Sequence, residues 1–471
     1  MQSVIHISDL KNAGLLIGMI LISLISMLFV LVDIDRPSGY GLLFLLPMFF
    51  ILLLLSTKNI EKEIPQNIGV TLLVFFEFIR MSVSPLLLVL SNYPEKIVLN
   101  VSANTPWAVL LMLYEAVAVF FVLNIDFQIK VCVFDRIDNL HSMRRMNYVM
   151  FFVIAMTISV ITLAPEILSN YRSIVGLFSD LNYTNSEQSY LVDEYATSSS
   201  KRFILATANY ILIVVRLLIP AFFIAYVNLK KIPLKKIISL FMIITPFLFV
   251  AGAIARSLYY SLFLIIFYLT LKKVDLKHLD KPILLAVGFV FAFFIVRFSL
   301  AGGGDDSFEM LATSFMSYFS GLNIVSGTFN LPRDFMTQLY YFARDIFGSI
   351  PFSTTIFRYD GLSVSHFFNF VNGTRGQIPS TIGLGCYYFS PFFAPVYSMF
   401  FAYVAKKYGR MFLAVENQFY KLIYMYLSFI AALGIGMYNI EIALGTMVRV
   451  ILPIYLIVRF AYRKTGFFTN A

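Results

Sequence analysis

The sequence predicts an all-α, polytopic membrane helix bundle, and two observations carry that prediction. Of the 471 residues, 59% are hydrophobic and only 13% are charged. The charges lie in clusters between apolar runs that are about as long as a helix needs to cross roughly 30 Å of hydrocarbon. Most of the chain therefore cannot face water.

The apolar runs predict about 12 transmembrane helices, with a large helical loop between helices 9 and 10. The spans are expected at 13–32, 40–56, 67–91, 106–124, 147–167, 203–228, 237–253, 257–271, 283–300, 381–404, 419–438 and 442–462. The seventh and eighth spans are short and nearly adjacent, so one hairpin that does not cross fully is the alternative. The chain then divides into a bundle of helices 1–9 (1–300) with a smaller outer loop (168–202), a large outer loop (301–380), and helices 10–12 (381–471).

Basic residues predict the orientation of the chain. Lys and Arg gather in alternate short loops, among them Lys406, Lys407 and Arg410 in the loop expected after helix 10. Because such loops stay cytoplasmic, both termini are expected in the cytoplasm. The net charge of +10 is then a topology signal, and no nucleic-acid partner is expected.

Metal and cofactor sites are not expected. The two cysteines, Cys132 and Cys386, fall in a loop and in a helix and cannot pair. The four histidines are scattered, and the chain contains no P-loop, GxGxxG or HExxH motif.

The large outer loop contains one segment with the pattern of an amphipathic helix, "LPRDFMTQLYYFARDIF" (331–347). Pro332 suits its first turn, and the apolar residues from Phe335 onward recur at helical spacing. Such a helix lies on the bilayer surface or caps the bundle. Arg333 and Arg344 would share one face about 16 Å apart. There they follow a long anionic or sugar chain or, together with Asp334 and Asp345, simply keep that outer face hydrated.

Several charges fall inside predicted spans: Glu77, Arg80, Glu115, Arg216 and Arg449. An ionised group at the centre of a span costs roughly 2.5–3.5 kcal/mol, so such groups usually face the bundle interior and have a partner. We expect Glu77 and Glu115 to pair with Arg80, Arg216 or Arg449. Proton-coupled transport is the functional alternative.

Three more arginines, Arg256, Arg297 and Arg375, are expected at one depth near the outer rim of the bundle. Anchoring at the membrane interface explains any one of them. The planar guanidinium also matches phosphate oxygens with paired hydrogen bonds. Three of them converging from separate elements predict a lipid phosphate or diphosphate as ligand.

Two stretches carry a resemblance to a known family. They are "GAIARSLYYSLFLIIFYLTLKK" (252–273) and "TRGQIPSTIGLGCYYFSPFFAPVYSMFFAYV" (374–404), set in a many-span bundle with one large outer loop late in the chain. In these features the chain resembles the bacterial Wzy-type O-antigen and capsule repeat-unit polymerases, which are related to O-antigen ligases. The resemblance implies a GT-C-like, metal-independent glycosyltransferase of the inner membrane. Its substrate would be an undecaprenyl-diphosphate-linked oligosaccharide, and a chain-length regulator and a flippase would be its partners.

The resemblance also suggests roles for individual residues. The diphosphate would be held by Arg256, Arg297, Arg375 and Arg216. The general base would be His366, Asp345 or Asp306, with Asp305, Glu309 and Asp360 as further candidates, and His366 ranks first because its ordinary pKa is near neutrality. Glycan contacts would come from Arg333, Arg344, Arg358, Asn372, Gln377, Ser380, Tyr387 and Tyr388.

The sequence is also compatible with three alternatives. An O-antigen ligase would share the fold and the donor and differ in its acceptor. A flippase or other transporter would be expected to show internal repeats, which this sequence lacks, and critical charges at the middle of the membrane. A receptor or scaffold would not need the rim arginines.

Overall fold

The computed structural model describes residues 7–58, 60–64, 66–93, 101–126, 140–166, 199–229, 307–350, 363–374 and 376–462, together with 263, 264, 266, 267 and 353. All regular structure in these residues is helical. The helices are α1 (Ile7–Val32), α2 (Leu45–Ser56), α3 (Ile60–Glu63), α4 (Ile68–Phe78), α5 (Ser84–Leu90), α6 (Val101–Asn124), α7 (Leu140–Leu163), α10 (Ser199–Leu229), α14 (Ser307–Tyr318), α15 (Leu322–Gly327), α16 (Phe335–Gly348), α18 (Val364–Asn372), α19 (Thr381–Phe393), α20 (Val396–Ala414), α21 (Gln418–Gly436), α22 (Ile440–Thr446) and α23 (Leu452–Tyr462).

Seven stretches among the described residues are long and apolar enough to cross a membrane, which confirms a polytopic helical membrane protein. They are Gly14–Val32, Ile68–Leu90, Ala103–Asn124, Arg145–Leu163, Phe203–Tyr226, Gln418–Gly436 and Ile440–Tyr462. The predicted span at 40–56 is a shorter apolar helix, Tyr40–Ser56. The spans predicted at 237–253 and 283–300, and most of the one at 257–271, lie outside the described residues.

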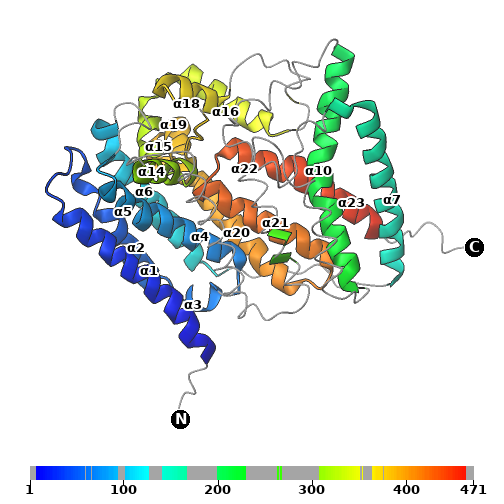
Figure 1. The fold of residues 1–471 in the computed structure, drawn as a ribbon, viewed down its shortest axis with the longest axis horizontal. Helices are drawn as coiled ribbons and strands as arrows, with labels where there is room; N and C mark the ends of the chain where they lie inside the picture. The colour runs from blue at the N-terminus through cyan, green and yellow to red at the C-terminus, as the bar shows by residue number, and fades with distance from the viewer. Residues whose placement is uncertain are drawn as a thin grey trace, which may run out of the picture.

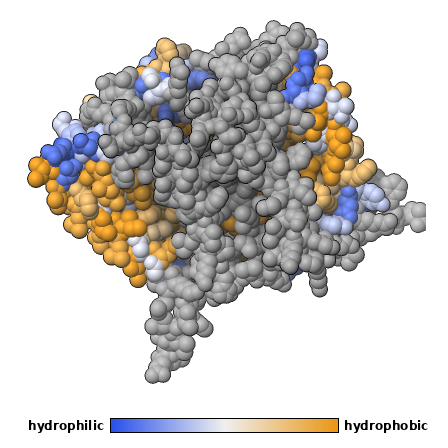
Figure 2. Space-filling model, in the orientation of Figure 1, coloured by the Kyte–Doolittle hydropathy of each residue, from blue (hydrophilic) through white to orange (hydrophobic). Residues whose placement is uncertain are grey.

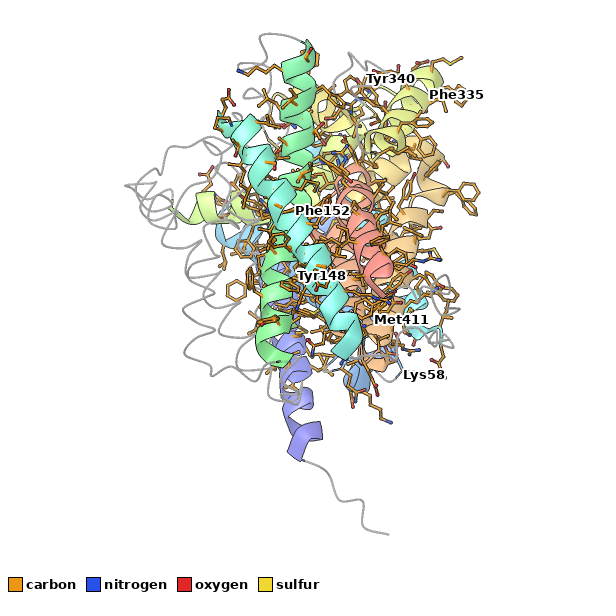
Figure 3. The ribbon with its side chains drawn as sticks, turned by 90° about the vertical axis from the view of Figure 1, so that its right-hand side faces the viewer. Lys58, Tyr148, Phe152, Phe335, Tyr340 and Met411 are labelled. Atoms are coloured by element: carbon orange, nitrogen blue, oxygen red, sulfur yellow. The ribbon has the colours of Figure 1, made fainter. Side chains whose placement is uncertain are left out.

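The bundle has apolar sides and two distinct ends. α1 and α2 lie on one side and α7 and α10 on the other, with α20 and α21 between them (Figure 1). Apolar side chains cover both of these sides in Figure 2. α16 and α18 lie at one end, called here the loop end, whereas Lys58 and Met411 lie toward the opposite end, called the α3 end (Figure 3). The loop end carries the large loop in which the sequence predicts a site.

Glycine lets α4 pack closely against α20 and α21 at the centre of the bundle. A Cβ atom at Gly69 would clash with the Ser428 hydroxyl and with the backbone carbonyl of Ala405. The Ser428 hydroxyl itself donates to that carbonyl, at 2.7 Å. These contacts fix the distance between the start of α4 and the pair formed by α20 and α21.

The predicted helix at 381–404 is wrong in one respect, because the chain breaks inside it. α19 and α20 are separate helices, and Ser390 adopts φ 74° and ψ 164° at the kink, a conformation otherwise nearly confined to glycine. Pro391 and Pro395 explain the break, since proline cannot donate a backbone hydrogen bond. α20 continues to Ala414, so Lys406, Lys407 and Arg410 lie in a helix rather than in the predicted loop.

Two of the membrane-spanning segments contain a π-helical turn, at Ile79–Val83 and at Met447–Ile451. A proline follows each turn closely, Pro85 in α5 and Pro453 in α23. Proline removes one backbone donor and its ring clashes with the preceding turn, so the helix widens there. Each π turn also holds an arginine, Arg80 in the first and Arg449 in the second.

Candidate functional site

α16 begins later than the sequence predicts. Asp334 is its N-cap and accepts a hydrogen bond from the Thr337 backbone N–H at 2.9 Å. The hydrogen bonds from Thr337 also hold the pKa of Asp334 below its usual range. A carboxylate at this position satisfies a free helix N–H, which Pro332 cannot do. Arg333 therefore precedes the helix, and the prediction that it shares a helical face with Arg344 is wrong.

α16 also faces the other way from an ordinary surface helix. Phe335, Leu339 and Ile346, three members of the predicted apolar stripe, are exposed. Asp345 and Gly348 are buried on the opposite side, where the Gln338 amide donates to the Tyr387 carbonyl at 2.7 Å. The interpretation that Asp345 keeps an outer face hydrated is therefore wrong, because Asp345 points into the protein.

Asp345 forms the centre of the candidate site. Its side chain is fully buried, and its Oδ2 accepts a hydrogen bond from the Tyr388 hydroxyl at 2.6 Å. Oδ1 has no hydrogen-bond partner among the described residues. Burial and the nearby Glu441 carboxylate raise the pKa of Asp345 to about 8, against the lowering effects of the Tyr388 hydrogen bond and the Arg344 charge. At neutral pH Asp345 can therefore both accept and release a proton.

Contacts between α22 and the C-terminal end of α16 hold Asp345 in place. Arg344 Nη1 lies 3.6 Å from Glu441 Oε1. The Ser349 hydroxyl donates to the Asp345 carbonyl at 2.8 Å and lies 3.4 Å from the carbonyl of Glu441. Arg449 donates to the Gly348 carbonyl at the last turn of α16, where a cation is favourable because the helix carbonyls there are unpaired.

His366 lies on α18, beside this site and not within it. Its side chain is exposed, and its Nδ1 lies 2.8 Å from the hydroxyl of Ser363, the N-cap of α18. The Asn439 amide donates to the Ser365 hydroxyl at 3.0 Å, which ties the start of α22 to α18. His366 is thus placed near the start of α22, the helix that carries Glu441.

Three predicted glycan contacts have roles in folding. The Asn372 amide donates to the carbonyls of Gly327 (3.2 Å) and Phe368 (2.9 Å). The Gln377 backbone bonds with Asn369 through both its N–H (3.0 Å) and its carbonyl (2.8 Å). Ser380 is the N-cap of α19.

Gly373 and Gly376, with φ of 65° and 71°, allow the tight turn between α18 and α19. The described residues between Asn372 and Thr381 accordingly belong to the connection between α18 and α19. A glycan role for their side chains stays a prediction.

The other described candidates are spread over several elements. Tyr387 is buried beside Tyr388, with no hydrogen-bond partner for its hydroxyl among the described residues. Arg333 lies over the Phe329 ring, 5.4 Å from the ring centre, and 3.8 Å from Cys386 Sγ. Arg216 is buried within α10. The predicted diphosphate residues Arg256, Arg297 and Arg375 lie outside the described residues, as do Arg358 and Asp306.

The predicted ion-pair network inside the bundle is present, with Arg80 as the arginine that bonds both carboxylates. Arg80 Nη1 lies 3.1 Å from Glu77 and Nη2 lies 2.6 Å from Glu115. Nε donates to the Ser320 carbonyl at 3.4 Å, and the Ser398 hydroxyl bonds to Glu115. We call these three charged residues the membrane triad. Arg449 lies instead at the loop end, against Gly348.

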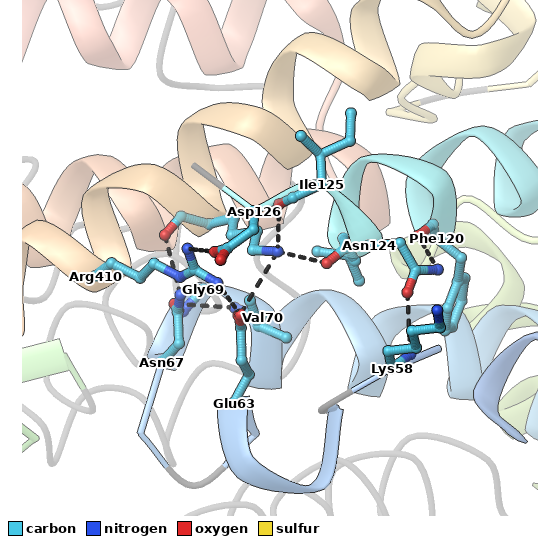
Figure 4. Close-up of polar contacts among 12 residues, drawn as sticks. Lys58, Glu63, Asn67, Gly69, Val70, Phe120, Asn124, Ile125, Asp126 and Arg410 are labelled. Carbon is cyan, nitrogen blue, oxygen red and sulfur yellow. Dashed lines mark hydrogen bonds and ion pairs between the residues drawn. The ribbon is translucent and has the colours of Figure 1, made fainter. Parts of the chain in front are cut away.

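A further polar cluster at the α3 end is not predicted from the sequence (Figure 4). The Lys406 ammonium donates to the Ile125 carbonyl at 2.8 Å, and Arg410 donates to Asp126 at 2.7 Å and also to Glu63. The Asn67 amide donates to the Lys406 carbonyl at 2.9 Å. These bonds join the ends of α3, α4 and α6 to α20, so the cluster holds helix ends together.

Sequence reasoning missed Glu441 and did not pair Tyr388 with Asp345. A signal for Glu441 exists, since it is a carboxylate at the very start of the last apolar run, in "YNIEIALG" (438–445). The partnership with Tyr388 joins residues 43 positions apart and leaves no local pattern. No group of three or more potential metal ligands occurs among the described residues.

Comparisons with protein-family models, with curated proteins and with solved structures found no match to this chain. The function of this chain is therefore inferred from its site.

Proposed function

We propose that this protein polymerises polyprenyl-diphosphate-linked oligosaccharide repeat units, with undecaprenyl diphosphate as leaving group, at the outer face of a bacterial inner membrane. Both termini would lie in the cytoplasm and the loop end outside. The observation that carries the proposal is Asp345, a buried carboxyl with a pKa raised to about 8 and oriented by Tyr388. Such a group suits general base catalysis, and perturbed carboxyls of this kind gather at active sites.

In the proposed reaction Asp345 accepts the proton of the acceptor sugar hydroxyl. The hydroxyl oxygen forms a bond to the anomeric carbon of the donor, while the bond from that carbon to the diphosphate oxygen breaks. The electron pair leaves with the diphosphate, whose charge Arg256, Arg297, Arg375 and Arg216 would stabilise. The proton on Asp345 then passes to solvent or to the departing diphosphate.

Asp345 takes the place of His366 as the first candidate for the base. His366 is exposed and bonds to its own helix cap. Asp345 is enclosed and has one oxygen, Oδ1, without a partner among the described residues. Because Asp345 is closed off, the acceptor hydroxyl reaches Oδ1 only after α16 moves away from α22 or α19. The proposed cycle therefore includes an opening step at α16.

A second candidate function is transport of the lipid-linked oligosaccharide across the membrane. The kink between α19 and α20 and the nearby membrane triad favour it, because broken helices beside buried charges are common in transporter sites. Ser398, just after the break, bonds directly to Glu115 of the triad. This observation concerns the bundle interior, whereas Asp345 lies at the loop end.

The experiment that tests the proposal uses the purified protein in lipid vesicles with one lipid-linked repeat unit, with and without a lipid A core acceptor. A ladder of products that is lost in Asp345→Asn supports the polymerase. Transfer only to a lipid A core acceptor identifies a ligase. Movement of the intact substrate between leaflets, without a new glycosidic bond, identifies a transporter and refutes the proposal.

A further inference from the structure

Helix α16 has an apolar side without charge that faces away from the protein. This side, called here the outer face of α16, consists of Phe335, Met336, Leu339, Tyr340 and Phe347, whose side chains are 43% to 70% exposed. At 100° per residue these five positions fall within one arc of the helix. Figure 3 shows Phe335 and Tyr340 at the periphery of the loop end.

The two charged residues of α16 lie on the other side. Arg344 faces Glu441, with 12% of its side chain exposed, and Asp345 is buried against Tyr388. A helix in water places its charges outward and its apolar residues inward. α16 does the reverse, which is the arrangement expected where the surroundings are hydrocarbon and the protein interior is polar.

The outer face of α16 is linked to the apolar surface of the bundle through α19. Phe342 of α16 packs edge-to-face on Phe389, with 5.2 Å between the ring centres. Phe392 and Phe393, at the end of the same helix, are largely exposed. The Tyr114 hydroxyl of α6 donates to the Phe392 carbonyl at 2.9 Å.

Tyr114 belongs to an exposed apolar stripe on α6, one of the helices long enough to span. The stripe consists of Trp107, Leu110, Tyr114, Val117 and Phe121, which recur at helical spacing. Because α6 spans the membrane, this exposed stripe faces lipid acyl chains. Apolar surface thus runs from α6 through the end of α19 to α16.

We infer that the outer face of α16 is embedded in the bilayer and contacts lipid acyl chains, so that α16 is a wall between the lipid and the Asp345 site. The occupant is lipid and not a partner protein, because the face lacks charge and joins the stripe of a spanning helix. The inference does not depend on the proposed function. Where that function holds, the lipid anchor of the substrate lies directly against this wall.

The test places a single tryptophan on α16 and asks which quencher reaches it. Trp107 is the only tryptophan of the chain, so Trp107→Phe gives a background without tryptophan emission. Leu339→Trp reports the outer face. Tyr341→Trp reports the inner side, where Tyr341 stacks on Phe367 at 4.7 Å. Glu61→Trp, at an exposed position of the α3 end, reports water, and the wild-type Trp107 reports the stripe on α6.

The proteins are reconstituted in phosphatidylcholine vesicles with and without brominated acyl chains, and acrylamide is added as the aqueous quencher. We expect brominated lipid to quench Leu339→Trp within about twofold of Trp107, and acrylamide to quench it several-fold less than Glu61→Trp. Acrylamide quenching equal to that of Glu61→Trp would overturn the inference, as would protection from both quenchers like that of Tyr341→Trp. Neither readout requires glycosyl transfer, so this test and the test of the proposed function fail independently.

Discussion

The membrane triad and the Asp345 site are both buried clusters of charge, yet their hydrogen bonds are completed to different degrees. In the triad, all three guanidinium nitrogens of Arg80 have acceptors, and Glu115 also bonds to Ser398. In the site, Asp345 has one oxygen bonded to Tyr388 and one without a partner among the described residues. A completed network fixes helices relative to one another, whereas an incomplete one leaves a group that can react.

The largest expected effect comes from breaking the triad. Arg80→Met leaves two buried carboxylates without their cation, which typically costs about 3–5 kcal/mol. We expect little monodisperse protein after detergent extraction, measured by size-exclusion chromatography. Arg459→Met, at an exposed position of α23, is the control and should behave as wild type.

A triple variant separates the charge of the triad from its shape. Arg80→Met combined with Glu77→Gln and Glu115→Gln removes every charge and keeps similar volumes. Much of the monodisperse protein that is lost in Arg80→Met should be recovered in the triple variant. If the triple variant extracts as poorly as Arg80→Met alone, then charge pairing is not what the triad provides.

The second effect concerns activity and not folding. Asp345→Asn removes the proposed base and should lower the rate of glycosyl transfer by about 10²–10⁴-fold, since general base catalysis contributes that much. Protein yield should stay at the wild-type level, in contrast to Arg80→Met. Wild-type product ladders from Asp345→Asn would exclude Asp345 as the base.

The raised pKa of Asp345 also predicts how stability depends on pH. The folded state keeps its proton up to about pH 8, whereas an unfolded aspartate loses it near pH 4. The folded state thus binds more protons between these values, so stability falls as pH rises from about 4 to 8. The thermal midpoint of Asp345→Asn should fall less than that of wild type over this range, and equal slopes would contradict the shifted pKa.

The third effect is a shift of the pH profile. Tyr388→Phe removes a hydrogen bond that lowers the pKa of Asp345, so the pKa should rise further. A base that is already mostly protonated at pH 7 loses about tenfold in active fraction for each unit of such a rise. The rate at neutral pH should therefore drop by about that factor and recover toward alkaline pH. A uniform loss at every pH would instead mean that Tyr388 acts on the substrate.

The smallest expected effect is a shift of the pH–rate profile in the direction opposite to that of Tyr388→Phe. Glu441→Gln removes a negative charge that raises the pKa of Asp345, so the rising limb of the pH–rate profile should move to lower pH. The rate at pH 6 should increase by a few-fold relative to that at pH 8. A shift to higher pH would show that the released Arg344, not the lost charge of Glu441, dominates the site.

The sequence predicts the spanning helices well and predicts their interruptions poorly. Each apolar run among the described residues that is predicted to span contains helix, because run length and hydropathy are local properties. The break at Ser390 is missed because Pro391 and Pro395 lie inside an otherwise continuous apolar run. The two π turns leave a comparable signal, a proline shortly after an arginine within a span.

The candidate site could be predicted only in part. Asp345, Tyr388 and Arg344 are all candidates from the sequence, with separate roles as base and glycan contacts. Their assembly with Glu441 and Arg449 depends on α16 packing against α19 and α22, through bonds that span 43 to 101 positions. No spacing in the chain encodes such a contact.

Composition and periodicity alone determined that this chain is a helical membrane protein, where the spans among its described residues lie, and that most of 331–347 forms a helix with one apolar side. Only the tertiary structure decided which side of that helix faces the protein. The physical reason is that lipid and a protein core are both apolar, so an apolar stripe does not say which of them it contacts. The Tyr388 hydroxyl of α19 donates to the Asp345 carboxyl, and Glu441 of α22 pairs with Arg344. These contacts turn the charged side of α16 toward the protein, because a buried carboxyl needs hydrogen-bond donors that hydrocarbon cannot supply.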